Sequence, residues 1–276
     1  MTKKYPKYSV LMTVYEKDNP QDFLLSLESM CLQTVTPDEI VIVKDGPIAQ
    51  SLQDVIDYCK EKYSINFNEV QLSVNKGLGL ALNEGIESCH NELIARMDAD
   101  DYSMPQRCEK QLDAFISNQN LDIVGCSVSE FIDDINNIVG YRKVPLTNKQ
   151  IYQFAKKRDP FNHPTVMYRK SLLEKVRKYS DYRKNQDTDL WIKILQNQAE
   201  CLNLDGDLFR FRFDKNTYQK RKSWLNTKIL IEIRYKAWKS GFNTFSDFLL
   251  IAVVQASMYI FPVTLQKFLY RTFLRK

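Results

Sequence analysis

The sequence has few residues of the kinds that build several common enzyme sites. It contains two histidines, His90 and His163, and its six cysteines are scattered without a Cys-x-x-Cys pair. A zinc site of histidine and cysteine is therefore not expected, and the cysteines fit reduced core residues. No Gly-x-Ser-x-Gly motif accompanies a histidine, which argues against a hydrolase with a serine nucleophile.

Residues that interrupt folded structure are also scarce. The 276 residues include 8 glycines and 9 prolines, no low-complexity tract and no fixed-period repeat. A hydrophobic content of 44% is sufficient for one large domain or two small ones joined by short linkers. No apolar run follows Met1–Lys4, so we expect no secretory signal and a cytoplasmic protein.

Charge is distributed unevenly along the chain. Residues 1–207 hold 25 Lys and Arg against 31 Asp and Glu, whereas residues 208–276 hold 14 against 3. The basic C-terminal part suggests an anionic partner such as a membrane surface or nucleic acid, with a solvated helix face as the alternative. Because no nucleic-acid-binding module is recognisable, no nucleic-acid partner is expected.

Apolar strands and amphipathic helices alternate in the first hundred residues. Ser9–Val14 and Glu39–Val43 are apolar and β-branched, as in strands buried on both faces, and a helix carrying Phe23 and Cys31 lies between them. The pattern continues with helices over 52–63 and 78–89 and strands over 70–74 and 93–97. It predicts an α/β fold whose sheet is mostly parallel and has helices on both faces.

Polar residues follow each of these four strands. Tyr15 follows the first strand, Asp45 the second, Asn75–Gly77 the third and Asp98–Asp101 the fourth. Because ligands of such sheets bind beyond the carboxyl ends of the strands, we expect these groups to face one crevice. Each alone is a common solvated turn, but their recurrence at four strand ends favours a site.

The chemistry of these groups suits a nucleoside diphosphate. Asp98 and Asp100 project to the same side of an extended segment, where their oxygens can share Mg²⁺ or Mn²⁺ with phosphate. Asp45 can accept an N–H from a base, Tyr15 offers a stacking face, and Lys76 precedes a helix N-terminus suited to phosphate. Neither a P-loop nor a dinucleotide glycine motif is present.

Two later segments carry further candidates. Asp187 lies near the start of an amphipathic helix, where it is either the N-cap or a general base that takes a proton from an incoming hydroxyl. His163, within Phe161–Thr165, is a candidate to contact substrate, metal or only the backbone.

Together these segments resemble the inverting family 2 glycosyltransferases of the GT-A fold, particularly bacterial exopolysaccharide, capsule and O-antigen enzymes of the amylovoran type. The resemblance covers roughly residues 8 to 212. Its carriers are Ser9–Tyr15, Ile42–Pro47, Asn75–Gly85, Ala95–Asp101 with Pro105 and Arg107, Asn162–Thr165 and Gln186–Trp191.

The resemblance implies a nucleotide-diphosphosugar fold, with a Rossmann-like, mixed and mostly parallel sheet over residues 1–212. Residues 1–118 would bind the nucleotide-sugar, residues 119–212 would bind the acceptor and supply the base, and residues 213–276 would form a basic, partly apolar helical tail. A lipid-diphosphate-linked saccharide is the implied acceptor. The alternatives are a sugar-phosphate nucleotidyltransferase and a non-catalytic nucleotide-sugar-binding protein.

The resemblance also implies roles for single residues. Tyr15 and Asp45 would contact uracil, Asp98 the ribose, Asp100 the metal (Mn²⁺ or Mg²⁺), with Asp98 as a second ligand, and Asp187 would be the catalytic base. The remaining nucleotide-sugar candidates are Thr13, Asn75, Lys76, Gly77 and Ala99. The candidates for contact with acceptor or substrate are Asp101, Arg107, His163, Asp189 and Trp191.

The sequence departs from the family pattern at three positions. Thr13 replaces a proline that many relatives carry, Leu82 stands where arginine is frequent, and Gln186 replaces the glutamate usual before the base. The last change bears on the properties of Asp187.

The C-terminal part has too short an uninterrupted apolar stretch to span a bilayer. An interfacial helix at the inner face of the cytoplasmic membrane fits it, and packing against the core or in an oligomer is the alternative.

Overall fold

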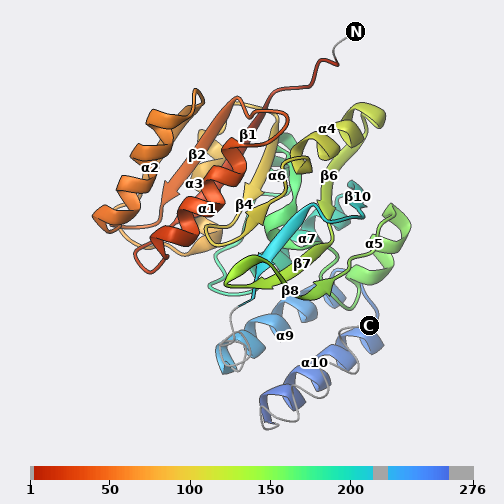
Figure 1. Cartoon of the computed structure of the whole chain (residues 1–276). Coiled ribbons are helices and arrows are strands. Elements are labelled where there is room, and N and C mark those ends of the chain that lie inside the picture. Colours follow the sequence, from red (N-terminus) through yellow and green to blue (C-terminus); the bar gives the residue numbers. More distant parts are fainter. Residues whose placement is uncertain (1–2, 214–222, 261–276) are drawn as a thin grey trace.

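A seven-stranded sheet forms the centre of the computed structural model, which describes residues 3–213 and 223–260. Figure 1 shows helices packed around this sheet. The strand order is β10-β6-β9-β4-β1-β2-β3, and every strand is parallel to its neighbours except β9, which is antiparallel to β4 and β6. The strands are β1 (Tyr8–Val14), β2 (Glu39–Lys44), β3 (Asn66–Gln71), β4 (Leu93–Met97), β6 (Leu121–Cys126), β9 (Met167–Arg169) and β10 (Glu200–Leu204). The mixed, mostly parallel sheet was predicted.

Two hydrophobic clusters cover the two faces of this sheet. Val10 of β1 belongs to one cluster and its neighbour Leu11 to the other, because successive side chains of a strand point to opposite faces. The first cluster includes residues of α1 (Pro20–Cys31), α2 (Gln50–Lys62) and α4 (Arg107–Ser117). The second includes residues of α3 (Leu78–Ser88), α5 (Asn148–Ala155), α6 (Lys170–Lys175) and α7 (Gln186–Gln196). All six cysteines are free and buried, as predicted.

The third strand lies earlier in the chain than predicted. The sequence pattern placed it at 70–74, whereas β3 spans Asn66–Gln71 and Leu72–Val74 separate its end from Asn75. The strand is at the edge of the sheet and its residues are exposed or half-buried, so it needs no continuous apolar run. The polar segment that follows therefore begins a few residues beyond the strand and not directly at its end.

A second sheet of four strands, which was not predicted, lies beside the acidic segment 98–101. Its order is β5-β11-β7-β8, formed by β5 (Tyr102–Ser103), β11 (Phe209–Arg212), β7 (Val128–Ile132) and β8 (Asp134–Arg142). Arg210 pairs with Tyr102 across β11 and β5. This pairing brings the last residues of the predicted transferase region next to Asp100 and Asp101.

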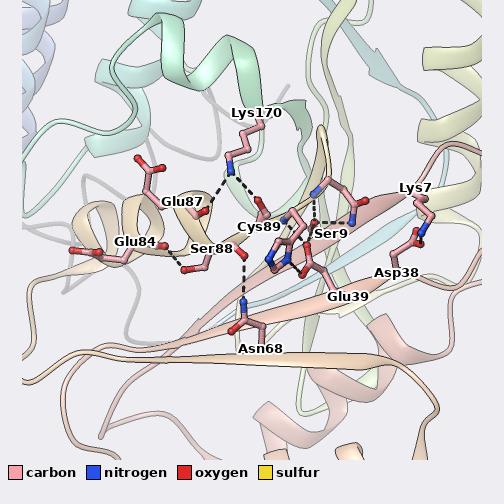
Figure 2. A network of polar contacts seen from close by, with 12 residues as sticks. Lys7, Ser9, Asp38, Glu39, Asn68, Glu84, Glu87, Ser88, Cys89 and Lys170 are labelled. Atoms are coloured by element: carbon pink, nitrogen blue, oxygen red, sulfur yellow. Dashed lines mark hydrogen bonds and ion pairs between the residues drawn. The ribbon is translucent and has the colours of Figure 1, made fainter.

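The N-terminal ends of β1 and β2 are pinned by a buried carboxylate (Figure 2). Glu39 accepts hydrogen bonds from Ser9 Oγ (2.5 Å) and His90 N (2.6 Å), and its second oxygen lies 2.7 Å from His90 Nδ1. Nearby, Lys170 Nζ donates to the carbonyl of Cys89 (2.8 Å) after the end of α3. These contacts fix the N-terminal ends of β1 and β2, and the candidate site lies at the opposite, carboxyl ends of the strands.

The C-terminal helices α9 (Trp224–Lys239) and α10 (Phe245–Ile260) lie outside the sheet and its helices (Figure 1). In α9, Ile229 and Ile233 pack with Ile192 of α7, and Arg234 Nη1 donates to the carbonyl of Ala155 (2.7 Å). No helix within 3–213 and 223–260 combines the length and apolar character needed to cross a bilayer. Residues 214–222 and 261–276 of the predicted tail lie outside the described residues.

The predicted division at residues 118 and 119 falls between α4 and β6. Strands from both predicted halves belong to the same seven-stranded sheet.

Candidate functional site

Asp45 joins the segment after β2 to the start of α3. Its buried carboxylate accepts hydrogen bonds from the main-chain amides of Lys76 (2.7 Å) and Gly77 (3.0 Å). Asn75 Nδ2 in turn donates to the carbonyl of Asp45 (3.2 Å). Gly46 has a φ of 90°, and a Cβ there would lie 2.8 Å from the amide nitrogen of Asn75, so this close approach requires glycine. Four predicted nucleotide-sugar residues are thus brought together.

The acidic segment after β4 gathers three carboxyl groups. Oxygen atoms of Asp98, Asp100 and Asp101 all lie within 4.8 Å of one another. Burial, and next the charge of Asp98, raises the pKa of Asp100 to about 6, and burial with the neighbouring carboxylates raises the pKa of Asp101 well above its usual value. Oδ2 of Asp101 is buried and has no hydrogen-bond partner. This hard, mutually repelling oxygen set fits a divalent cation of the Mg²⁺ or Mn²⁺ type.

Positive charge and hydrogen bonds hold this segment in place. Arg96, a buried residue of β4, forms an ion pair with Asp98, whose carbonyl also accepts from Ser26 Oγ of α1 (2.6 Å). Arg212 of β11 donates through Nε to the carbonyl of Asp100 (2.8 Å). These contacts offset part of the negative charge, and the raised pKa values of Asp100 and Asp101 indicate that the rest is left for a cation.

Asp187 lies in the first turn of α7. The N-cap of this helix is Asn185, at a φ of 55°, so the alternative interpretation of Asp187 as the N-cap is wrong. Burial, and next the charge of Asp159, raises the pKa of Asp187 to about 6, while the amides at the helix start and Arg96 oppose this shift. A carboxyl group with this pKa is ionised near neutral pH yet more basic than an exposed aspartate, as a general base requires.

The start of α7 packs against the start of α3. A Cβ added at Gly79 would lie 3.3 Å from Cβ and Cγ of Gln186, and one added at Gly77 would lie 2.9 Å from Nη1 of Arg183. Gln186 is buried in this contact. The residue before the predicted base therefore touches the helix whose N-terminal segment Asp45 holds.

The predicted residues at the end of β1 lie near the acidic segment. The side chain of Tyr15 is 39% exposed, and Thr13 stands beside Val43 in the register of β1 and β2. Asp18 accepts from the amide of Tyr15 (2.9 Å), and burial followed by the charges of Asp100 and Asp98 raises its pKa to about 7. The segment that positions Tyr15 is therefore electrostatically coupled to the acidic segment. Ala99, between the acidic residues, is buried.

Three predicted substrate candidates are buried beneath the site. Arg107 Nη2 donates to the carbonyl of Arg96 (2.8 Å), and Trp191 packs on Phe161 with ring centroids 5.0 Å apart. His163 Nε2 lies 2.7 Å from the Tyr179 hydroxyl. Burial, reinforced by the charge of Arg96, lowers the pKa of His163 well below its usual value, so its ring is neutral. All three side chains make these contacts in the interior and are not exposed at the surface for direct contact with a substrate.

The fourth candidate on this side, Asp189, is engaged by its own neighbourhood. Ser180 Oγ donates to its carboxylate (2.6 Å), and Lys193 Nζ lies 3.4 Å from the same oxygen. These contacts tie the segment before α7 to the helix.

Sequence reasoning did not assign roles to Asp18, Arg96 or Arg212. Arg96 had a detectable signal, because it lies in β4 only two residues before Asp98, and residues two apart in an extended segment project to the same side. Asp18 and Arg212 had none, since their relation to the acidic segment arises only when distant parts of the chain fold together.

The chain matches one family model and is similar over nearly its whole length to two bacterial glycosyltransferases. The model of the family described as glycosyl transferase family 2 matches residues 9–177. A UDP-Gal:alpha-D-GlcNAc-diphosphoundecaprenol beta-1,3-galactosyltransferase of Escherichia coli is 32% identical over 100% of this chain and 99% of its own length. The amylovoran biosynthesis glycosyltransferase AmsE of Erwinia amylovora is 34% identical over 95% of this chain and 97% of its own length.

A solved structure resembles the chain in fold. The mannosyltransferase PcManGT of Pyrobaculum calidifontis, in complex with GDP-Man and Mn²⁺, superposes with a TM-score of 0.65 at 14% identity. The match covers 92% of this chain and 70% of that protein.

Proposed function

Because the chain belongs to glycosyl transferase family 2, we propose that it transfers a hexose, with inversion, from a UDP-linked donor to a hydroxyl of a lipid-diphosphate-linked saccharide. Family membership makes the protein a glycosyltransferase of polysaccharide biosynthesis and leaves the nucleotidyltransferase and non-catalytic alternatives without support. The UDP donor, the hexose and the lipid-linked acceptor are proposed beyond what family membership shows.

One observation carries the proposal. The Asp98–Asp101 segment and the segment held by Asp45 both lie at the carboxyl ends of parallel strands, and Asp187 lies in the first turn of the helix packed against the latter segment. A metal-binding group, a nucleotide-binding segment and a general base are the three elements that a metal-dependent inverting transferase needs.

On the donor side, Tyr15 would stack on uracil and Asp45 would accept its N–H. Each carboxylate oxygen of Asp45 holds one main-chain amide and has a further lone pair for a base. Asp100 and Asp98 would hold Mn²⁺ or Mg²⁺, which offsets the charge that develops on the departing diphosphate. Lys76 and the N-terminus of α3 would face the phosphate or ribose.

On the acceptor side, Asp187 would take the proton of the attacking hydroxyl. The hydroxyl oxygen forms a bond to the anomeric carbon as the bond from that carbon to the phosphate oxygen breaks, and the electron pair leaves with UDP. A single displacement inverts the anomeric centre, so an α-linked donor gives a β-glycoside. The raised pKa of Asp187, about 6, suits this proton transfer near neutral pH.

The lipid-linked acceptor fits attachment to the inner face of the cytoplasmic membrane. The name of the Escherichia coli relative describes an acceptor joined to diphosphoundecaprenol. In α10, Leu249, Leu250 and Val253 are 48, 52 and 58% exposed, and the basic residues of the C-terminal part would meet anionic headgroups. We assign the outer face of α10 to this contact.

The test is transfer from a panel of nucleotide sugars to membrane-extracted lipid-linked acceptors in the presence of Mn²⁺. We expect product from a UDP-hexose and none from GDP-linked sugars. Asp100→Ala should abolish transfer by weakening metal and donor binding. Product formed from every nucleotide sugar alike, or from none, would contradict the assignment of the donor.

A further inference from the structure

Arg212, at the end of β11, contacts three separate parts of the chain. Its Nε donates to the carbonyl of Asp100 (2.8 Å), and Nη2 lies 2.9 Å from the carboxylate of Asp22 in α1. Nη1 donates to the carbonyl of Asp133 (3.4 Å), and the guanidinium lies 4.6 Å from the ring centroid of Phe131. Each guanidinium nitrogen therefore has a separate partner.

Both contacts of Arg212 with the acidic segment favour one backbone arrangement. The guanidinium binds the carbonyl of Asp100, and the main-chain amide of Arg212 donates to Oδ1 of Asp101 (2.8 Å). The carboxylate of Asp100 takes part in neither contact. Arg212 thus holds the main chain of this segment while that carboxylate stays available for a cation.

The charge of Arg212 and its hydrogen bonds have opposite effects on the affinity of the acidic segment for a divalent cation. A guanidinium near Asp100 lowers the affinity of that carboxylate for another cation, although the ion pair with Asp22 offsets part of its field. Its hydrogen bonds, in contrast, fix the main chain that carries the metal ligands, and residues that orient ligands typically change metal affinity by about 10- to 100-fold. The two effects predict opposite results when Arg212 is removed.

We propose that Arg212 is a positioning residue that sets the acidic segment in the conformation that binds the divalent cation. The proposal rests on the metal site of the proposed function. It is supported by the contacts of the Arg212 guanidinium, which lies more than a hundred residues after Asp100 in the chain. The guanidinium donates to the main chain of the acidic segment and also contacts α1 and the turn between β7 and β8. The planar fork of arginine makes these contacts together, which the point charge of lysine cannot do.

The experiment titrates the full-length protein with Mn²⁺ alone and measures free Mn²⁺ by electron paramagnetic resonance. The variants are Arg212→Met, Arg212→Lys, Asp100→Ala and the matched control Arg210→Met. Arg210 lies on the same strand but its side chain contacts Ile135, Asn136 and Asp207, away from the acidic segment. Thermal unfolding followed by circular dichroism checks that each variant is folded.

We expect Arg212→Met to weaken Mn²⁺ binding by about 10-fold or more. Arg212→Lys should also weaken it, because the charge is kept but the fork is lost. Arg210→Met should bind like the wild type. Unchanged or tighter binding in Arg212→Met would overturn the proposal, since tighter binding is what removal of a nearby positive charge alone produces. If Arg212→Met does not fold, the Mn²⁺ affinity of Arg212→Lys is compared with that of the wild type instead, and unchanged or tighter binding overturns the proposal.

The measurements distinguish failure of the proposed metal site from failure of the proposed role of Arg212. Mn²⁺ binding that is absent from the wild type, or unaffected by Asp100→Ala, would contradict the metal site itself and the role of Arg212 with it. Binding that is lost in Asp100→Ala but kept in both Arg212 variants would contradict only the role of Arg212.

Discussion

The carboxylate of Asp45 and the main-chain amide of Gly77 are joined by a hydrogen bond of 3.0 Å, across a sequence separation of 32 residues. The same carboxylate holds the amide of Lys76 (2.7 Å). This contact closes the segment after β2 against the start of α3, and Gly77 accommodates it at a φ of 90°, where glycine is favoured. The proposed nucleotide-binding segment therefore depends on a structural anchor as well as on groups that would face the ligand.

Asp45→Ala should weaken UDP binding and lower stability together. The amides of Lys76 and Gly77 would lose their acceptor, which costs about 1–3 kcal/mol of unfolding free energy when buried groups are left unpaired. Isothermal titration with UDP and chemical denaturation measure the two effects. Asp54→Ala removes an exposed carboxylate of α2 and is the matched control. If Asp45→Ala binds UDP as tightly as the wild type, Asp45 does not hold the segment that binds UDP.

The rate of transfer should follow the ionisation of Asp187. As the proposed base, Asp187 would work only when deprotonated, and its pKa is raised to about 6, so kcat should be level above this pH and fall about tenfold per pH unit below it. The profile is measured at saturating Mn²⁺ and donor, so that Asp100 stays ionised on the metal. A kcat that does not change between pH 7 and pH 5 would exclude Asp187 as the base.

Gln186→Glu should shift this profile towards higher pH. A carboxylate beside Asp187 disfavours its ionised form, so the pKa of Asp187 should rise further and the acid limb should move upward. Because Gln186 is buried against Gly79, the variant should also lose some stability. Gln186→Met, which adds no charge at the same packed position, serves as the control. An acid limb that moves to lower pH would contradict this electrostatic account.

The network around Glu39 predicts loss of stability in acid. Burial opposes ionisation, but hydrogen bonds from Ser9 and His90 hold the pKa of Glu39 below its ordinary value of 4.5 (Figure 2). A group with a lowered folded-state pKa contributes stability above its unfolded pKa, and this contribution is lost as the pH falls through the folded value. The free energy of unfolding, measured with denaturant between pH 7 and pH 3, should therefore change less steeply with pH in Glu39→Gln than in the wild type. An equally steep change in the two proteins would contradict this role of Glu39.

Charge placed on the outer face of α10 should reduce membrane binding. Leu250→Glu with Val253→Glu puts two carboxylates where we expect contact with anionic headgroups, so the bound fraction should fall several-fold. Sedimentation with vesicles that contain phosphatidylglycerol measures it. Leu32→Glu changes an apolar residue of 58% exposure after the end of α1 and is the control. Equal sedimentation of wild type and double variant would remove α10 from the proposed contact.

Local patterns in the sequence predicted the parts of the fold that local forces determine. The apolar runs of β1 and β2 and the helical spacing of Phe23 and Cys31 predicted strands and a helix that the structure contains. The parallel order then placed the ends of β1, β2 and β4 together. The edge strand β3 was misplaced because half-exposed residues carry no clear apolar signal.

Contacts between distant segments had no such signal. The second sheet depends on β5, a strand of two residues, pairing with β11. Arg212 is therefore predicted from sequence only as one cation of a basic region, and its position beside Asp100 follows from that pairing. The N-cap of α7 was missed because Asn185 adopts a left-handed conformation.

Asp187→Asn removes the ionisable carboxylate of the proposed base and keeps the size of the side chain. We would measure transfer of hexose from UDP-hexose to the lipid-linked acceptor together with UDP affinity in the same preparation. We predict that transfer falls by about 100-fold or more, as expected when a general base is removed, while UDP binds as in the wild type. Undiminished transfer by Asp187→Asn would contradict the assignment of the base and the proposed mechanism with it.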